Sequence, residues 1–249
     1  MSKDYLLIAA VKDGDKHKAQ RAIDEGARID CRDHKGQSIL EVAEQYQQHH
    51  LVRFLVQAGA NPNQIVGKQG NSLLQRSILR HDTGFARALM ECNADIHARN
   101  LAGENALMLA VKTGDVYCAN DLIRAGARID EQARSGDTAL HIAARDGNTE
   151  MVSMLLKYEP DTQLKNRRHY TALQEAIASG HTDASALLLD RMILDSDNLD
   201  GQIIPARKTA EHHRQPKLLE LLMASETTPT QSFTERFYPD QTPHKGIWR

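Results

Sequence analysis

A phrase that recurs about every 33 residues limits the fold of this chain more than any other feature. Its clearest form is GDTALHIAARDGNTEMVSMLLKY, residues 136–158. A leucine at the same place in each copy stands at Leu40, Leu74, Leu107, Leu140 and Leu173, so successive copies are 34, 33, 33 and 33 residues apart. A constant period of this length is typical of stacked supersecondary units that bury their apolar faces against one another. The repeat therefore predicts a stack of similar units.

Each copy has the pattern of two short helices. In the clearest copy, Thr138 can cap the first helix with its hydroxyl, and Gly147 can end that helix in a left-handed turn. Leu140 lies on the apolar side of the first helix, together with two alanines that allow close packing. The apolar stripe of the second helix consists of Met151, Val152, Leu155 and Leu156.

These copies resemble the ankyrin repeat family. The family motif T-P-L-H-x-A-A appears as TALHIAA at residues 138–144, and the family ending G-A-D-x-N appears as GANPN at residues 59–63. The resemblance covers residues 1–224 and implies an all-α ankyrin-repeat solenoid, with stacked helix-turn-helix units and projecting β-hairpin loops. It also implies that His141 holds its turn together by hydrogen bonds and that the stack has about seven repeats, including degenerate caps.

Some copies depart from the family pattern. Gln47 and His81 stand where the family has the glycine that ends the first helix, and Gln75 and Ser77 replace the histidine and an alanine. We expect repeat units near residues 1–30, 31–63, 64–96, 97–130, 131–162, 163–196 and 197–225. The terminal units are expected to be atypical because one face of each meets water.

Residues 226–249 do not repeat and form a tail rich in proline and aromatic residues. Its aromatic residues are Phe233, Phe237, Tyr238 and Trp248. The composition leaves three interpretations open. The tail covers the apolar face of the last unit, or it is a free recognition segment, or it is an export signal like that of some ankyrin proteins of intracellular bacteria.

Function is expected on positions that vary between copies, because the shared residues build the core. The family resemblance implies that the loop tips and the ends of the first helices form a concave surface that binds a partner protein. The candidate partner-binding residues are His34, Lys35, Tyr46, Lys68, Arg80, Lys112, Arg134, Asp137, Arg145, Arg167, Arg168 and Tyr170. Arginine and the two tyrosines are the candidates for the largest energetic contributions.

The loop tips are basic, and only Glu104 and Asp137 are expected to oppose them nearby. Such a surface favours an acidic partner, since complementary charge steers association and sets register. The alternative is a solvated loop edge without a partner. The formal net charge of −2 and the absence of a known reading motif argue against nucleic acid.

The pattern predicts no catalytic residues, metal ligands or cofactors. The adjacent pairs His49-His50 and His212-His213 do not share a helix face. In the segment that begins at Asp195, Gly201 comes one residue too late for a calcium loop, and Ala206 stands where the closing glutamate should be. We therefore expect a non-enzymatic interaction module. The alternatives are a secreted bacterial effector, or a regulatory or inhibitory subunit acting on a host or cellular enzyme.

The chemistry of the chain indicates an intracellular compartment. The three cysteines are widely spaced, which fits a reducing environment. Charges interrupt the short apolar run in residues 1–18, and no run approaches the roughly 20 apolar residues of a membrane helix. We expect a cytoplasmic monomer without membrane insertion, with export to a host cell as the alternative destination.

Overall fold

The computed structural model describes residues 2–195 and 200–227. These residues fall into two compact units: residues 2–113 with 121–127, and residues 114–120 with 128–195 and 200–227. The first unit contains α1 (Lys3–Asp13), α2 (Lys16–Asp24), α3 (Ile39–Gln45), the 3-10 turn η1 (His49–Leu51), α4 (Val52–Gln57), α5 (Leu73–Leu79), α6 (Thr83–Glu91), α7 (Ala106–Lys112), and the strands β1 (Ile65–Val66) and β2 (Asn71–Ser72). The second contains α9 (Ala139–Arg145), α10 (Thr149–Leu156), α11 (Ala172–Ala178), α12 (Thr182–Asp195), α13 (Asp200–His212) and α14 (Pro216–Thr227), and α8 (Val116–Arg124) is divided between the units.

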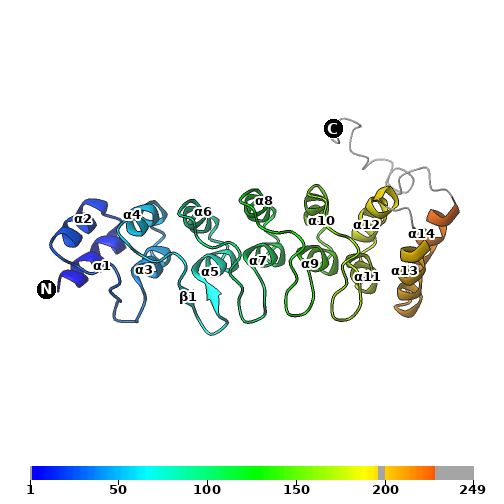
Figure 1. Cartoon of the computed structure of the whole chain (residues 1–249), viewed down its shortest axis with the longest axis horizontal. Coiled ribbons are helices and arrows are strands. Elements are labelled where there is room, and N and C mark those ends of the chain that lie inside the picture. The colour runs from blue at the N-terminus through cyan, green and yellow to red at the C-terminus, as the bar shows by residue number, and fades with distance from the viewer. Residues whose placement is uncertain (1, 196–199, 228–249) are drawn as a thin grey trace, which may run out of the picture. The chain divides into compact units, whose positions relative to one another are not determined.

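Helices of the same kind pack on one another within each unit, as the repeat predicted. In the first unit α1 packs on α3, α5 on α7, and α4 on α6. In the second unit α9 packs on α11, α11 on α13, and α10 on α12. Figure 1 shows the resulting rows of first and second helices, with loops that reach past the first helices of each unit. The all-α ankyrin-repeat fold expected from the sequence is confirmed.

The recurring leucine forms the core between helices. Leu40, Leu74, Leu107, Leu140 and Leu173 are each no more than 2% exposed. The stripe on α10 is buried as well, since Met151, Val152 and Leu155 are fully inaccessible. The period of the sequence is therefore the period of core positions.

The first helices begin with a reciprocal cap that uses different residues in different copies. In α9, the Thr138 hydroxyl accepts a hydrogen bond from the His141 backbone N–H, and the His141 ring reaches back to the Thr138 backbone. The His141 Nε2 lies 3.0 Å from the Tyr170 carbonyl of the next repeat. In α5, Gln75 accepts from the Ser72 N–H and donates to the Glu104 carbonyl at 2.9 Å. Gln75 thus performs the role that the resemblance assigned to the histidine.

A left-handed residue separates the two helices of a repeat even where glycine is absent. Gly147 has φ of 68°, and Gln47 and His81 have φ of 57° and 58° at the same place. A side chain in this conformation costs about 1–2 kcal/mol, because the Cβ lies too close to the following carbonyl oxygen. Arg214, with φ of 53°, lies at the same place between α13 and α14. These non-glycine turns are therefore strained but keep the geometry of the repeat.

We expect the variant His81→Gly to raise the free energy of unfolding by about 0.5–1 kcal/mol, since relief of the left-handed strain exceeds the extra chain entropy that glycine loses on folding. Urea unfolding followed by circular dichroism measures the change. The matched variant His81→Ala keeps the Cβ and should bring no comparable gain. An equal gain from both variants would contradict this explanation.

No helix among the described residues is long and apolar enough to cross a bilayer.

Candidate protein-binding surface

Up to α12, five loops join one repeat to the next, and we call each of them a finger. The fingers are residues 33–37, 65–72, 100–104, 133–137 and 166–170. Finger 65–72 is an antiparallel hairpin in which Ile65 pairs with Ser72 and Val66 with Asn71. The other four are closed by one backbone hydrogen bond between their first N–H and their last carbonyl, at 2.9–3.0 Å.

In three of these fingers, the side chain of the first residue, an Asp or Asn, accepts hydrogen bonds from backbone N–H groups of the same finger. The Asn166 Oδ1 accepts hydrogen bonds from the N–H groups of Arg168 and Tyr170. Asn100 makes the same two contacts in its own finger, and Asp33 does so in the first finger. The side chain therefore satisfies backbone donors that the tight turn leaves without partners.

Two pairs of fingers are clipped together by a backbone hydrogen bond at their tips. In the first unit, the Leu101 N–H donates to the Gln69 carbonyl at 3.0 Å. In the second unit, the Arg167 N–H donates to the Ser135 carbonyl at 2.9 Å. We call fingers 65–72 and 100–104 the first-unit finger pair, and fingers 133–137 and 166–170 the second-unit finger pair.

Side chains at the base of each finger pair form a second hydrogen bond between the two fingers. The Asn100 Nδ2 donates to the Asn71 Oδ1 at 3.0 Å, and the Asn166 Nδ2 donates to the Asp137 Oδ1 at 2.8 Å. Gly136 allows the close approach in the second pair, since a Cβ there would lie 2.7 Å from the Arg167 backbone nitrogen. Each finger pair is therefore held at its tip and at its base.

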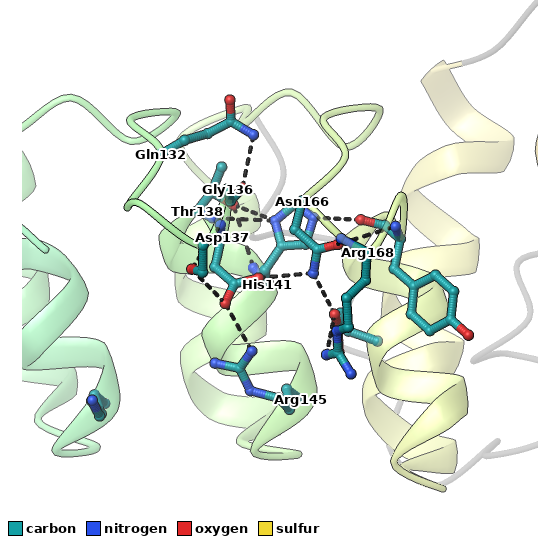
Figure 2. Close-up of polar contacts among 12 residues, drawn as sticks. Gln132, Gly136, Asp137, Thr138, His141, Arg145, Asn166 and Arg168 are labelled. Carbon is teal, nitrogen blue, oxygen red and sulfur yellow. Dashed lines mark hydrogen bonds and ion pairs between the residues drawn. The ribbon is translucent and has the colours of Figure 1, made fainter. Parts of the chain in front are cut away.

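The base of the second-unit finger pair is a buried polar network, drawn in Figure 2. Asp137 lies between Arg145, at 2.9 Å, and Asn166, which also contacts Glu175. Burial alone would raise the pKa of Asp137, but hydrogen bonds from Arg145 and Asn166 outweigh burial and lower it. Burial lowers the pKa of the adjacent His141, which favours the neutral ring that its two hydrogen bonds require. Asp137 is thus a structural anion of the finger base.

The expected surface charge needs a correction, because buried carboxylates neutralise several of the predicted cations. The sequence indicated only Glu104 and Asp137 as opposing acids. In the structure, Glu44 pairs with Arg80 at 3.3 Å and also with Arg76, and Glu175 pairs with Arg168. The Glu44 and Glu175 side chains are no more than 2% exposed.

The remaining candidates divide into paired and unpaired groups. Lys112 pairs with Glu104 at 3.2 Å, Arg145 pairs with Asp137, and His34 lies 3.9 Å from an Asp33 oxygen. Within residues 2–195 and 200–227, the candidate cations whose side chains have neither an ion pair nor a hydrogen bond are Lys35, Lys68, Arg134 and Arg167. All four are exposed and lie on fingers.

The two tyrosine candidates contact cations from nearby. The Lys12 ammonium lies 5.5 Å from the centre of the Tyr46 ring, and Tyr46 is 42% exposed. The Arg168 guanidinium lies 5.5 Å from the centre of the Tyr170 ring. Arg168 therefore has both a carboxylate and an aromatic partner within its own unit. The tail candidates Phe233, Phe237, Tyr238 and Trp248 lie outside the described residues.

The buried charges of Arg76 and Glu175 were not predicted, although a comparison of the copies position by position indicates them. Arg76 and Glu175 occupy the repeat position that holds Val42, Leu109 and Ile142 in the other copies. A charge at a core position requires a partner, because an unpaired buried charge is costly. Among the described residues, no group of three or more histidine, cysteine or acidic side chains is placed to hold a metal ion.

Comparison with known proteins agrees with the geometry. A family model described as ankyrin repeats (3 copies) matches residues 6–100 and again residues 101–199. The ankyrin repeat domain of Bcl-3, a member of the IkappaB protein family, is 26% identical over 75% of this chain and 85% of that chain, with a TM-score of 0.67. An ankyrin repeat domain from Acinetobacter baumannii AYE is 28% identical over 75% of this chain and 97% of that chain, with a TM-score of 0.66.

A more distant likeness concerns the fold alone. One chain in the complex of the Bd0816 predatory endopeptidase from Bdellovibrio bacteriovorus with immunity protein Bd3460 is 22% identical. The match covers 74% of this chain and 96% of that chain, with a TM-score of 0.61.

Since the two family matches together span more than half of the 249 residues, the chain belongs to the ankyrin repeat family and is a protein–protein interaction module.

Proposed function

We propose that the chain binds a partner protein through its fingers, and that the partner presents acidic side chains to them. The observation that supports this proposal is the division of the basic residues. The cations at the ends of the first helices, Arg80, Lys112 and Arg145, are paired with carboxylates of this chain. The candidate cations without an internal partner, Lys35, Lys68, Arg134 and Arg167, lie on the fingers, where a partner can approach them.

The unpaired arginines of the second-unit finger pair are the strongest candidates for the contact. Arg134 and Arg167 can each bind a carboxylate with two parallel hydrogen bonds without leaving an internal partner. Arg168 and Arg145 differ, because a new partner would have to compete with Glu175 and Asp137, which are buried. The binding role predicted for the whole basic strip is therefore concentrated in Arg134 and Arg167.

The clip between the fingers supports the same assignment. Because the Arg167 N–H is bonded to the Ser135 carbonyl, the two finger backbones are ordered before the partner arrives. An ordered loop loses less conformational entropy on association than a mobile one. Finger geometry and charge together favour a carboxylate-bearing surface as the ligand.

We expect the double variant Arg134→Ala/Arg167→Ala to bind the partner at least about tenfold more weakly than the wild type, and with a weaker dependence on salt. The partner is first captured from lysate with the wild type and identified, and affinities are then measured by titration calorimetry. The control is Lys157→Ala, an exposed lysine at the end of α10. Wild-type affinity in the double variant would refute the assignment.

A chain that ends at Thr227, the last residue of α14, tests the tail separately. Loss of the partner only in this shortened chain would place the contact on residues 228–249 and leave the repeats as a scaffold. The regulatory alternative uses the same fingers. It requires that the captured partner is an enzyme whose activity changes when the chain is added.

A further inference from the structure

One fingertip differs in chemistry from the others. The second residue of the finger turn is His34, Lys68, Arg134 or Arg167 in four fingers, and it is Leu101 in finger 100–104. Leu101 is 59% exposed. A single exposed leucine is common on protein surfaces, so its exposure alone indicates no ligand. Leu101 differs from such a residue because it replaces a cation and because the neighbouring finger bonds its backbone.

The neighbouring finger holds Leu101 in place. The Leu101 N–H is bonded to the Gln69 carbonyl, and its side chain rests against Gly70. A Cβ on Gly70 would lie 3.0 Å from the Leu101 Cγ and 3.5 Å from the Leu101 backbone nitrogen. The neighbouring finger therefore fixes the backbone position of Leu101, so this residue does not lie on a free loop.

The same finger pair displays a second apolar side chain and one unpaired cation. Ile65 on β1 is 62% exposed. Lys68 lies in the turn of this hairpin and is exposed. The first-unit finger pair thus combines two exposed aliphatic side chains with one positive charge, whereas the second-unit finger pair presents arginines at its tips.

We propose that the first-unit finger pair binds a segment of the partner in which an aliphatic or aromatic side chain lies next to an acidic residue. Leu101 and Ile65 contact the apolar side chain, and Lys68 contacts the carboxylate. Charge complementarity to Lys68 and removal of the exposed apolar surface from water both favour this occupant. The inference rests on the proposed function, because it assigns a second contact of different chemistry to the same fingers.

The test uses a phage-displayed library of random linear peptides selected against the full chain. We expect the enriched peptides to place a large apolar residue beside aspartate or glutamate. The best peptide is then synthesised, and its affinity is measured by fluorescence polarisation. The variant Leu101→Ser/Ile65→Thr should bind it at least about tenfold more weakly, since loss of an anchoring side chain typically has this effect.

Two further variants separate binding from folding. Leu101→Arg restores the residue found at Arg134 and Arg167, keeps the backbone clip, and should weaken the peptide without lowering the melting temperature. Tyr117→Ser removes a more exposed side chain, 83% accessible, from α8 and should leave the affinity unchanged. An equal loss in Tyr117→Ser would overturn the assignment to Leu101 and Ile65.

Other outcomes distinguish this inference from the proposed function. Peptides that lack an apolar residue, or that bind Leu101→Ser/Ile65→Thr as tightly as the wild type, would overturn the inference, as would a selection that enriches no peptide. Suppose that the selected peptides bind Leu101→Ser/Ile65→Thr as tightly as the wild type but no longer bind Arg134→Ala/Arg167→Ala. The contact with the arginines is then supported, and only the contact with Leu101 and Ile65 is refuted. If peptides depend on Leu101 and not on the arginines, the leucine contact stands alone.

Discussion

Replacing Arg76 with alanine is expected to lower the free energy of unfolding by about 3–5 kcal/mol, because it leaves a buried carboxylate without its main partner. Arg76 on α5 bonds Glu41 at 2.6 Å and also bonds Glu44, both on α3. The Glu44 side chain is only 2% exposed and the Arg76 side chain 18% exposed. Urea unfolding of the wild type and of Arg76→Ala measures the difference.

The control removes the buried pair rather than one member of it. Arg76→Leu/Glu44→Ile introduces the residues found at the equivalent positions of other copies, Leu109 and Ile78. Replacement of a buried ion pair by apolar residues of similar size is often neutral or stabilising. We therefore expect the double variant to be more stable than Arg76→Ala. A double variant no better than the single one would contradict the explanation.

The stability lost in Arg76→Ala should depend on pH, because the unpaired carboxyl of Glu44 can take up a proton. Burial raises the pKa of Glu44 despite the opposing effect of Arg76 and Arg80. A carboxyl with a raised pKa in the folded state binds its proton more tightly when folded, so its charge disfavours folding above that pKa. Protonation removes this cost as the pH falls. The loss caused by Arg76→Ala should accordingly shrink between neutral and mildly acidic pH.

Gly136→Ala is expected to be the second large effect, with a loss of about 2–5 kcal/mol from left-handed strain and backbone overlap combined. Gly136 has φ of 79°, and an added Cβ would lie 2.7 Å from the Arg167 nitrogen and 2.9 Å from the Asn166 Cα. Both neighbours are backbone atoms, so no side chain can rotate away. The measurement is urea unfolding, with the affinity for the partner as a second readout.

Gly36→Ala is the matched control for this prediction. Gly36 has nearly the same φ, 77°, but an added Cβ would meet nothing within 4 Å. Its cost should be the left-handed strain alone, about 1–2 kcal/mol. If both variants lost the same stability, the close approach of the fingers would contribute nothing.

The parts of the fold that depend on neighbours within one repeat could be predicted from the sequence. Thr138 and Gly147 lie where their propensities place them, because a cap and a left-handed turn depend on a few adjacent residues. The recurring leucines are buried because each occupies the same position in a repeating structure. Periodicity therefore predicted helices, turns and core together.

The contacts between repeats could not be predicted in the same way. The pairing of Arg168 with Glu175, and of Arg76 with Glu44, depends on the orientation of long side chains across a packed interface. The basic fingertips therefore indicated a more uniform positive surface than the structure has. Aligning the copies by position would have shown Arg76 and Glu175 at core positions, but it would not have identified their partners.

The clip between fingers has a consequence for how such a chain can diversify. The bonds that join Leu101 to Gln69 and Arg167 to Ser135 use only backbone atoms. A change of side chain at either tip therefore leaves the hydrogen bond in place. The two tips that donate this bond carry leucine and arginine, which differ in size and charge, and this agrees with that freedom. Substitutions at the tips can therefore change the binding specificity while the backbone conformation of the loop stays the same. New specificity can evolve without a loss of stability.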